Sequence, residues 1–152
     1  MDFAVTRGLL VGPTPQGRYA EERRILAEHF PGFTLSQTGP QQAGVAAGRL
    51  TTFANQSYML RIVLPADYPN TLPAIVPDGW KPMKNPHIYT NGNMCVMKPN
   101  QWHAFMSIAF LVAKSALWLN KYEIFVDRAI WPGAEQHPHG PIYRLRKWAN
   151  EL

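Results

Sequence analysis

Cysteine is nearly absent from this chain, because Cys95 is the only one among 152 residues. A single cysteine cannot form an internal disulfide, and without a second thiol it makes a poor structural metal site. Cys95 is therefore either a small buried hydrophobe or a working thiol. It directly follows the Gly/Asn-rich residues 91–94, and this place at the end of a turn favours the working thiol.

Long apolar runs are also lacking, since no segment approaches the roughly 20 residues needed to cross a bilayer. The first residues do not form a secretory signal, so we expect a soluble, cytoplasmic protein with no membrane partner, in which a lone thiol stays reduced. The formal charge of +5 does not come from one basic cluster. Apart from Arg23-Arg24 and residues 144–147 the basic residues are scattered, so nucleic-acid binding ranks last among the function classes.

Proline, by contrast, is abundant, and seven of the 14 prolines lie from Pro65 to Pro99. This concentration predicts a long, rigid, non-repetitive stretch in the middle of the fold. Before it, the patterns predict a helix over 18–30, in which Glu22 belongs to the charged residues away from the packed face. They also predict strands over 33–38, 44–54, 57–64 and 74–76, with a hairpin turn at 55–56.

After the proline-rich stretch, residues 107–120 are apolar nearly all round and predict a buried helix. Residues 122–129 are expected to continue as helix, and residues 142–152 to form a terminal helix. No repeat or linker divides the chain. We therefore expect one α+β domain over residues 1–152, in which an N-terminal helix and an antiparallel four-stranded meander precede a long loop and the central and C-terminal helices.

Three motifs occur in a suggestive order. A Tyr-Pro…Pro turn occupies residues 67–73, the segment 85–95 reads Asn-Pro-His-Ile-Tyr-Thr-Asn-Gly-Asn-Met-Cys, and Trp102 follows shortly before the apolar helix. In this order and spacing, residues 18–120 resemble the ubiquitin-conjugating enzymes. That family has a similar turn after its third strand and a His-Pro-Asn…Asn-Gly-x-Ile-Cys segment with the same distance from Pro to Cys.

The departures from that pattern are equally informative. Asn85 stands where the family usually has His, and His87 stands where it has the Asn credited with supporting the oxyanion. The region after Asn120 does not follow the eukaryotic pattern. It resembles the divergent bacterial branch, found in operons that attach ubiquitin-like proteins to targets, often in antiphage defence.

The resemblance implies an acyltransferase that works without a cofactor. Cys95 would accept the C-terminus of a ubiquitin-like protein as a thioester from an activating enzyme, and would then pass it to an amine of a target protein. The alternative is a catalytically inactive module of the same fold that binds a ubiquitin-like protein. Inactive variants of the family lack the cysteine, so Cys95 at the expected position argues against this alternative.

His87 is the second candidate catalytic residue, and its role stays open at this point. As imidazolium it would favour the Cys95 thiolate, as a hydrogen-bond donor it would stabilise the oxyanion, and as a base it would deprotonate the incoming lysine. A fourth interpretation is that His87 only caps the turn by bonding to backbone groups.

Other residues are expected to support the loop. Asn85 belongs to it, the Asn91-Gly92 pair is a strong turn signal, and Gly92 suits a left-handed backbone. Tyr89 either walls the cleft or packs on Trp102, which we expect to be a structural anchor.

Histidines and arginines outside this segment complete the set of candidates. His103, His137 and His139 invite a metal site with Cys95, but their spacing matches no known site, so we predict no metal. The loop that carries His137 and His139 is instead expected to fold back over Cys95 and tune it. On the first helix, the resemblance implies that Arg23 and Arg24 dock the activating enzyme, and a solvated helix face is the alternative.

Overall fold

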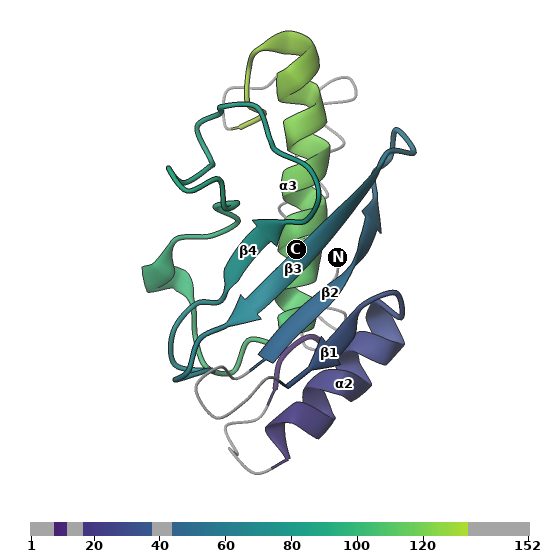
Figure 1. Ribbon diagram of the computed structural model, residues 1–152, viewed down its shortest axis with the longest axis vertical. Coiled ribbons are helices and arrows are strands. Elements are labelled where there is room, and N and C mark those ends of the chain that lie inside the picture. Colours follow the sequence, from purple (N-terminus) through teal and green to yellow (C-terminus); the bar gives the residue numbers. More distant parts are fainter. Residues whose placement is uncertain (1–7, 12–16, 38–43, 134–152) are drawn as a thin grey trace.

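The computed structural model describes residues 8–11, 17–37 and 44–133, and its elements follow one another in the predicted order (Figure 1). The predicted terminal helix 142–152, together with His137 and His139, lies outside the described residues. The elements are α2 (Arg18–His29), β1 (Thr34–Ser36), β2 (Gly44–Thr51), β3 (Ser57–Leu64), β4 (Ala74–Pro77), the short 3-10 helix η1 (Pro99–Gln101) and α3 (Ile108–Arg128).

The four strands form one antiparallel sheet in the order β1-β2-β3-β4, which confirms the predicted meander. The β2–β3 hairpin runs in register from Gly44 opposite Leu64 to Thr51 opposite Ser57. Strand β2 ends at Thr51, three residues earlier than predicted. The turn that follows is wider than two residues, and Asn55 in it has a positive φ of 63°. The alternation predicted for residues 57–64 places every second side chain of the C-terminal half of β3 in the core.

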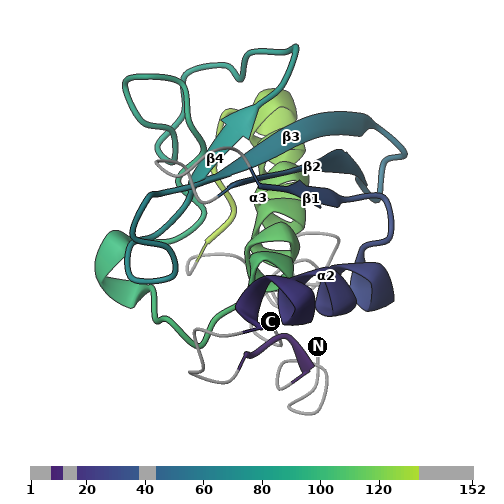
Figure 2. The same ribbon diagram turned by 60° about the horizontal axis from the view of Figure 1, so that its bottom comes forward.

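Both helices pack against this sheet. In Figure 1, α3 passes behind the strands and α2 lies beside β1, and Figure 2 shows the same arrangement from below. The core between them is built from aliphatic side chains of β3, α2 and α3, with Leu60 and Ile62 fully buried. The predicted α+β class is therefore confirmed.

Helix α3 is one continuous helix, as expected from the prediction that residues 122–129 continue the helix over 107–120. Ser107 caps its start, since the Ser107 hydroxyl accepts a hydrogen bond of 3.0 Å from the backbone N–H of Phe110. Its end is marked by Ala129 in the left-handed conformation, with φ 58°. Because α3 is unbroken, residues seven apart along it share one face.

One expectation about α2 is wrong. Glu22, predicted on the charged face, is fully buried with 0% exposure. Its carboxylate accepts hydrogen bonds from the Arg18 guanidinium at 3.0 Å, the Tyr68 hydroxyl at 3.0 Å and the backbone N–H of Ile108 at 2.7 Å. These partners satisfy the buried charge and tie α2 to the start of α3, which no local pattern reveals.

Within the described parts of the chain, no helix is both long and apolar enough to span a bilayer.

Candidate active site

The segment that ends in Cys95 is fastened to both layers of the fold. The backbone N–H of Met94 donates to the carbonyl of Ile75 in β4 at 2.9 Å. The N–H of Cys95 donates to the carbonyl of His87 at 3.0 Å, and the indole N–H of Trp118 in α3 donates to that same carbonyl at 2.9 Å. These bonds fix the backbone of Cys95 between the sheet and α3.

The turn before Cys95 has the shape that its sequence predicts. Tyr89 and Asn93 are joined by a backbone bond of 2.9 Å, and the N–H of Gly92 donates to the Tyr89 carbonyl at 2.9 Å. Gly92 has φ 90°, in the left-handed region. The Asn91 side-chain oxygen accepts from the N–H of Asn93 at 3.0 Å. Asn91 and Gly92 thus shape the loop.

Asn85 holds the other end of the loop. It is buried, its amide group donates to the Met83 carbonyl at 2.9 Å, and its side-chain oxygen accepts from the backbone N–H of His87 at 2.8 Å. Asn85 therefore fixes the backbone from which the His87 ring projects.

Cys95 is partly exposed, and its thiol has two polar neighbours. The sulfur lies 3.7 Å from the carbonyl oxygen of Met97. A hydrogen bond with the Cys95 side chain, followed by burial and the charge of the thiolate, raises the pKa of Tyr89. Tyr89 therefore stays a neutral phenol beside the sulfur and keeps a proton to donate.

The His87 ring packs against the Trp131 ring, with ring centroids 4.7 Å apart. Burial, and then the positive charge of Lys121, lower its pKa, so the neutral imidazole is favoured at neutral pH. Among the described residues the ring has no hydrogen-bond partner. The hydrogen bonds that His87 makes in the turn come from its backbone groups, with the Asn85 side chain as one partner.

Tyr89 and Trp102 face different surroundings. Trp102 is buried, its indole N–H donates to the Pro69 carbonyl at 2.8 Å, and its ring centroid lies 6.3 Å from that of Tyr68. Tyr89 is 42% exposed and lines a hollow beside Cys95. The structure thus places Trp102 under the turn of residues 67–73 and Tyr89 at the surface.

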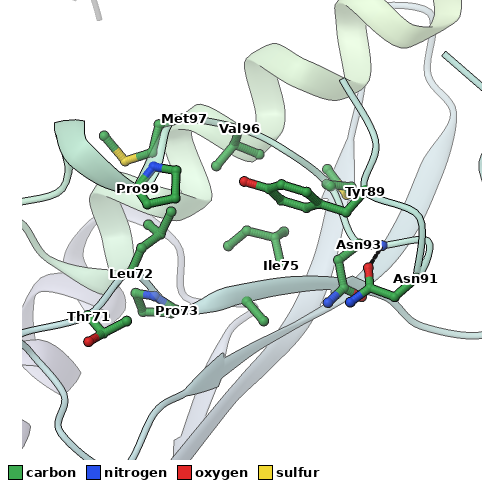
Figure 3. A pocket seen from close by; sticks show the side chains of 12 residues that line it. Thr71, Leu72, Pro73, Ile75, Tyr89, Asn91, Asn93, Val96, Met97 and Pro99 are labelled. Carbon is green, nitrogen blue, oxygen red and sulfur yellow. Dashed lines mark hydrogen bonds between the residues drawn. The ribbon is translucent and has the colours of Figure 1, made fainter. Parts of the chain in front are cut away.

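The hollow beside Tyr89, which we call the apolar groove, has a volume of about 250 Å³. Figure 3 shows the Tyr89 ring lying across it, next to Val96 and above Ile75. Its remaining walls come from the end of β4, the turn before it and the residues after Cys95: Thr71, Leu72, Pro73, Ala74, Asn91, Asn93, Met94, Met97 and Pro99.

A second hollow, which we call the basic pocket, is lined in part by Cys95 and has a volume of about 160 Å³. Val96 lines both hollows, whereas Cys95, its neighbour in the chain, lines the basic pocket. The pocket is lined by His87, Cys95, Val96, Lys114, Leu117, Trp118, Lys121 and Trp131. His87 and Cys95, eight residues apart, are thereby brought to one site.

The remaining candidates do not line either hollow. Arg23 and Arg24 are exposed on α2, where Arg24 forms ion pairs with Glu21 at 2.5 Å and Glu28 at 3.1 Å. His103 stacks on Phe105 with centroids 5.1 Å apart. In the described ranges, no three His, Cys, Asp or Glu side chains come together as a metal site.

Sequence reasoning missed Lys114, Lys121 and the two tryptophans of the basic pocket. A signal was present: within residues 108–122 the two lysines are the charged residues, seven apart in an otherwise apolar helix. Such a pair on a buried helix marks a face that meets something polar.

Comparisons with known proteins identify the family to which the chain belongs. A family model described as type II CBASS E2 protein matches residues 22–138. Among solved structures, human ubiquitin-conjugating enzyme E2 G1 is similar at 18% identity and a TM-score of 0.46, over 69% of this chain and 95% of that one. A comparison with curated proteins found no match. Because the family model spans most of the sequence, the chain belongs to the type II CBASS E2 family, whose members have a role like that of ubiquitin-conjugating enzymes in bacterial antiphage defence.

Proposed function

We propose that this protein carries a ubiquitin-like protein as a thioester on Cys95 and transfers it to a target amine. The observation that carries the proposal is the placement of Cys95. It is partly exposed, its backbone N–H bonds to His87, and the preceding residue Met94 bonds to β4. Its side chain lines the basic pocket, and its chain neighbours Met94 and Val96 line the apolar groove. A fixed, accessible thiol close to two hollows suits a group that must meet a donor and then an acceptor.

The proposed reaction has two acyl-transfer steps. The Cys95 thiolate attacks the carbonyl carbon of the donor's C-terminus, which an activating enzyme presents as a thioester, and the activating enzyme's sulfur leaves. An amine of the target protein then attacks the new thioester. Its C–N bond forms, the C–S bond to Cys95 breaks, and the nitrogen loses a proton. The reaction takes place in the cytoplasm and needs no cofactor.

We assign His87 the role of the base that accepts the proton in that second step. Its ring is in the pocket with Cys95, and its lowered pKa favours the neutral form, which can accept a proton from the attacking nitrogen. The same lowered pKa disfavours the imidazolium role. Tyr89, a neutral phenol at the sulfur, is placed to donate a hydrogen bond to the thiolate as it leaves.

The apolar groove suits the donor's C-terminal tail. Its walls are mostly Leu, Pro, Ile, Val and Met side chains, which favour an extended peptide with small or apolar residues. The exposed Arg23 and Arg24 on α2 remain the proposed docking residues for the activating enzyme, with Arg23 the freer of the two because Arg24 is paired within the helix.

The proposal is tested by incubating the protein with its cognate activating enzyme, the ubiquitin-like protein and ATP. We expect an adduct that a thiol reagent removes and that Cys95→Ala abolishes. Since the chain has one cysteine, any thiol-sensitive adduct on it reports Cys95 alone. Cys95→Ser is the matched variant, and it should give an adduct that resists the thiol reagent, because an oxyester replaces the thioester.

The contrary result is equally clear. If the correct partners bind the protein but charge neither the wild type nor Cys95→Ser, the protein is a binding module for the ubiquitin-like protein. Mass spectrometry of the wild-type adduct must also place the modification on the peptide that contains Cys95.

A further inference from the structure

The basic pocket contains two lysines that have no acidic partner. Lys114 and Lys121 are both half-buried, and neither forms an ion pair with any described residue. None of the described residues that line the pocket is acidic. The Lys114 ammonium lies 5.8 Å from the centroid of the Phe110 ring, which supplies no full negative charge. A charge removed from water is normally paired, so two partly buried cations without an acidic partner among the described residues leave the pocket short of negative charge.

The helix fixes both lysines toward the same hollow. They are seven residues apart on α3, which places their backbones about 10 Å apart along the axis and on one face. Leu117 and Trp118 lie between them on that face and form the pocket floor. The lysines therefore stand at the two ends of a space that also holds the Cys95 side chain.

The electrostatics agree with this geometry. Burial lowers the pKa of Lys114, and burial together with the charge of Lys114 lowers the pKa of Lys121. An ion pair with a carboxylate would act in the opposite direction. Lys121 also lowers the pKa of His87. The three nitrogen-bearing side chains thus make the pocket unfavourable for a further cation and favourable for an anion.

We infer that the basic pocket binds a carboxylate of the acceptor, so that the protein prefers amines that carry a carboxylate close to the attacking nitrogen. This inference rests on the proposed function. A bare ammonium that approached Cys95 from this side would meet two charges of its own sign. A neighbouring carboxylate, as in an acidic residue beside the target lysine, compensates both lysines and brings the amine to the thioester.

The size and walls of the pocket fit such a ligand. A volume of about 160 Å³ holds one side chain, and the rings of Trp118 and Trp131 provide apolar walls for its methylene groups. The pocket wall also includes His87, so the carboxylate and the proposed base serve the same amine.

Carboxylate binding is tested first on the protein without an adduct on Cys95 and without its partner proteins. We would titrate glutarate, with glutaramide as its neutral counterpart, at constant ionic strength and follow the NMR signals of Lys114, Lys121 and the Trp118 indole. We expect a saturable response to glutarate alone, weakened about tenfold in the double variant Lys114→Gln/Lys121→Gln. The exposed lysines outside both hollows provide the matched control, Lys81→Gln/Lys84→Gln, which should bind as the wild type does.

Two results of this titration would overturn the inference. These are an equal response to glutaramide, and glutarate binding that survives the double substitution.

The preference for acceptors is tested by single-turnover discharge of the Cys95 adduct. Nα-acetyl-lysine and Nα-acetyl-lysinamide differ only in the carboxylate, and we expect several-fold faster discharge to the first. The ratio should fall to about one in Lys114→Gln/Lys121→Gln and persist in Lys114→Arg/Lys121→Arg, which keeps the charges. A ratio of one in the wild type overturns the inference, whereas a protein that binds glutarate but never forms an adduct contradicts the proposed function instead.

Discussion

The two hollows near Cys95 share the Val96 side chain but differ in size, walls and charge. The apolar groove is larger, at about 250 Å³ against 160 Å³, and is built from loops and the end of β4. The basic pocket is built on α3 and carries a histidine and two lysines that form no ion pair with the described residues. Cys95 lines this cationic pocket, and its chain neighbours Met94 and Val96 line the apolar groove. This arrangement lets a donor and an acceptor approach the thiol over surfaces of different chemistry.

This division predicts that substitutions in the pocket affect discharge of the thioester, whereas substitutions of the aliphatic side chains in the groove affect its formation. Tyr89 takes part in both steps, because its ring lines the groove and its side chain hydrogen-bonds to that of Cys95. A substitution that changes the rate of one step alone supports this division. A substitution in one hollow that changes both rates equally contradicts it.

The largest effect is expected on the pocket side, from His87→Gln. Removing the proposed base should slow single-turnover discharge about 100-fold while charging stays near the wild-type rate. Because its pKa is lowered, His87 is still neutral at a pH equal to the ordinary histidine pKa of about 6.5. The wild-type discharge rate should therefore fall only when the pH drops below that value and His87 becomes protonated. His87→Gln should lack that inflection.

Two outcomes would contradict this role for His87. Unchanged discharge would reduce His87 to a wall of the pocket. An unchanged pH profile together with slowed discharge would assign it hydrogen bonding to the oxyanion in place of proton transfer.

On the groove side, Met97→Asp should lower the rate of charging about tenfold. A charge in the groove removes apolar contact with the donor tail, and burying one such side chain contributes about 1.5 kcal/mol or more. Discharge of adduct already formed should change little. Met83→Asp is the control, because Met83 is 56% exposed and lines neither hollow. Equal loss in both variants would mean that general surface charge, and not the groove, governs charging.

A smaller effect is expected from Asn85→Ala, which removes the side-chain bonds to Met83 and to the backbone of His87. The free energy of unfolding should fall by about 1 kcal/mol, measured by urea denaturation. Discharge should slow more than charging, because the loosened backbone carries His87 and the groove lies on the other side. Equal slowing of both steps would show that the loop moves as one unit.

The smallest effect is expected from Tyr89→Phe. The ring that lies across the groove is kept and only the hydroxyl beside the sulfur is lost, so discharge should slow about threefold. Charging should be unaffected, and Tyr89→Ala, which also removes the ring, should slow charging as well. A phenylalanine variant with wild-type discharge would leave Tyr89 as a wall of the groove alone.

Much of the fold was predictable because its signals are local. The alternation in residues 57–64 predicts a strand with one buried face, and the structure buries Leu60, Ile62 and Leu64. The Asn91-Gly92 pair predicts a turn, and Gly92 has the left-handed backbone that this turn needs. Both follow from properties of neighbouring residues, which the chain carries into any context.

Other features were not predictable because they depend on distant partners. Glu22 has the pattern of a surface residue, yet Arg18, Tyr68 and the start of α3 supply enough hydrogen bonds to bury it. Nothing local to Trp131 in the sequence indicates that its ring lines the pocket beside His87. Such placements need the whole core to form first.

The sequence alone thus determined that this chain has a single cysteine at the end of a turn, a four-stranded meander with a buried helix behind it, and a place among the conjugating-enzyme-like proteins. Only the tertiary structure decided what surrounds that thiol. Lys114, Lys121 and Trp131 are far from Cys95 along the chain, and they reach it because α3 packs behind the sheet and Trp118 bonds to the loop. Periodicity and turn chemistry act between neighbours, whereas the charge and shape of a site arise from packing between segments that no local pattern joins.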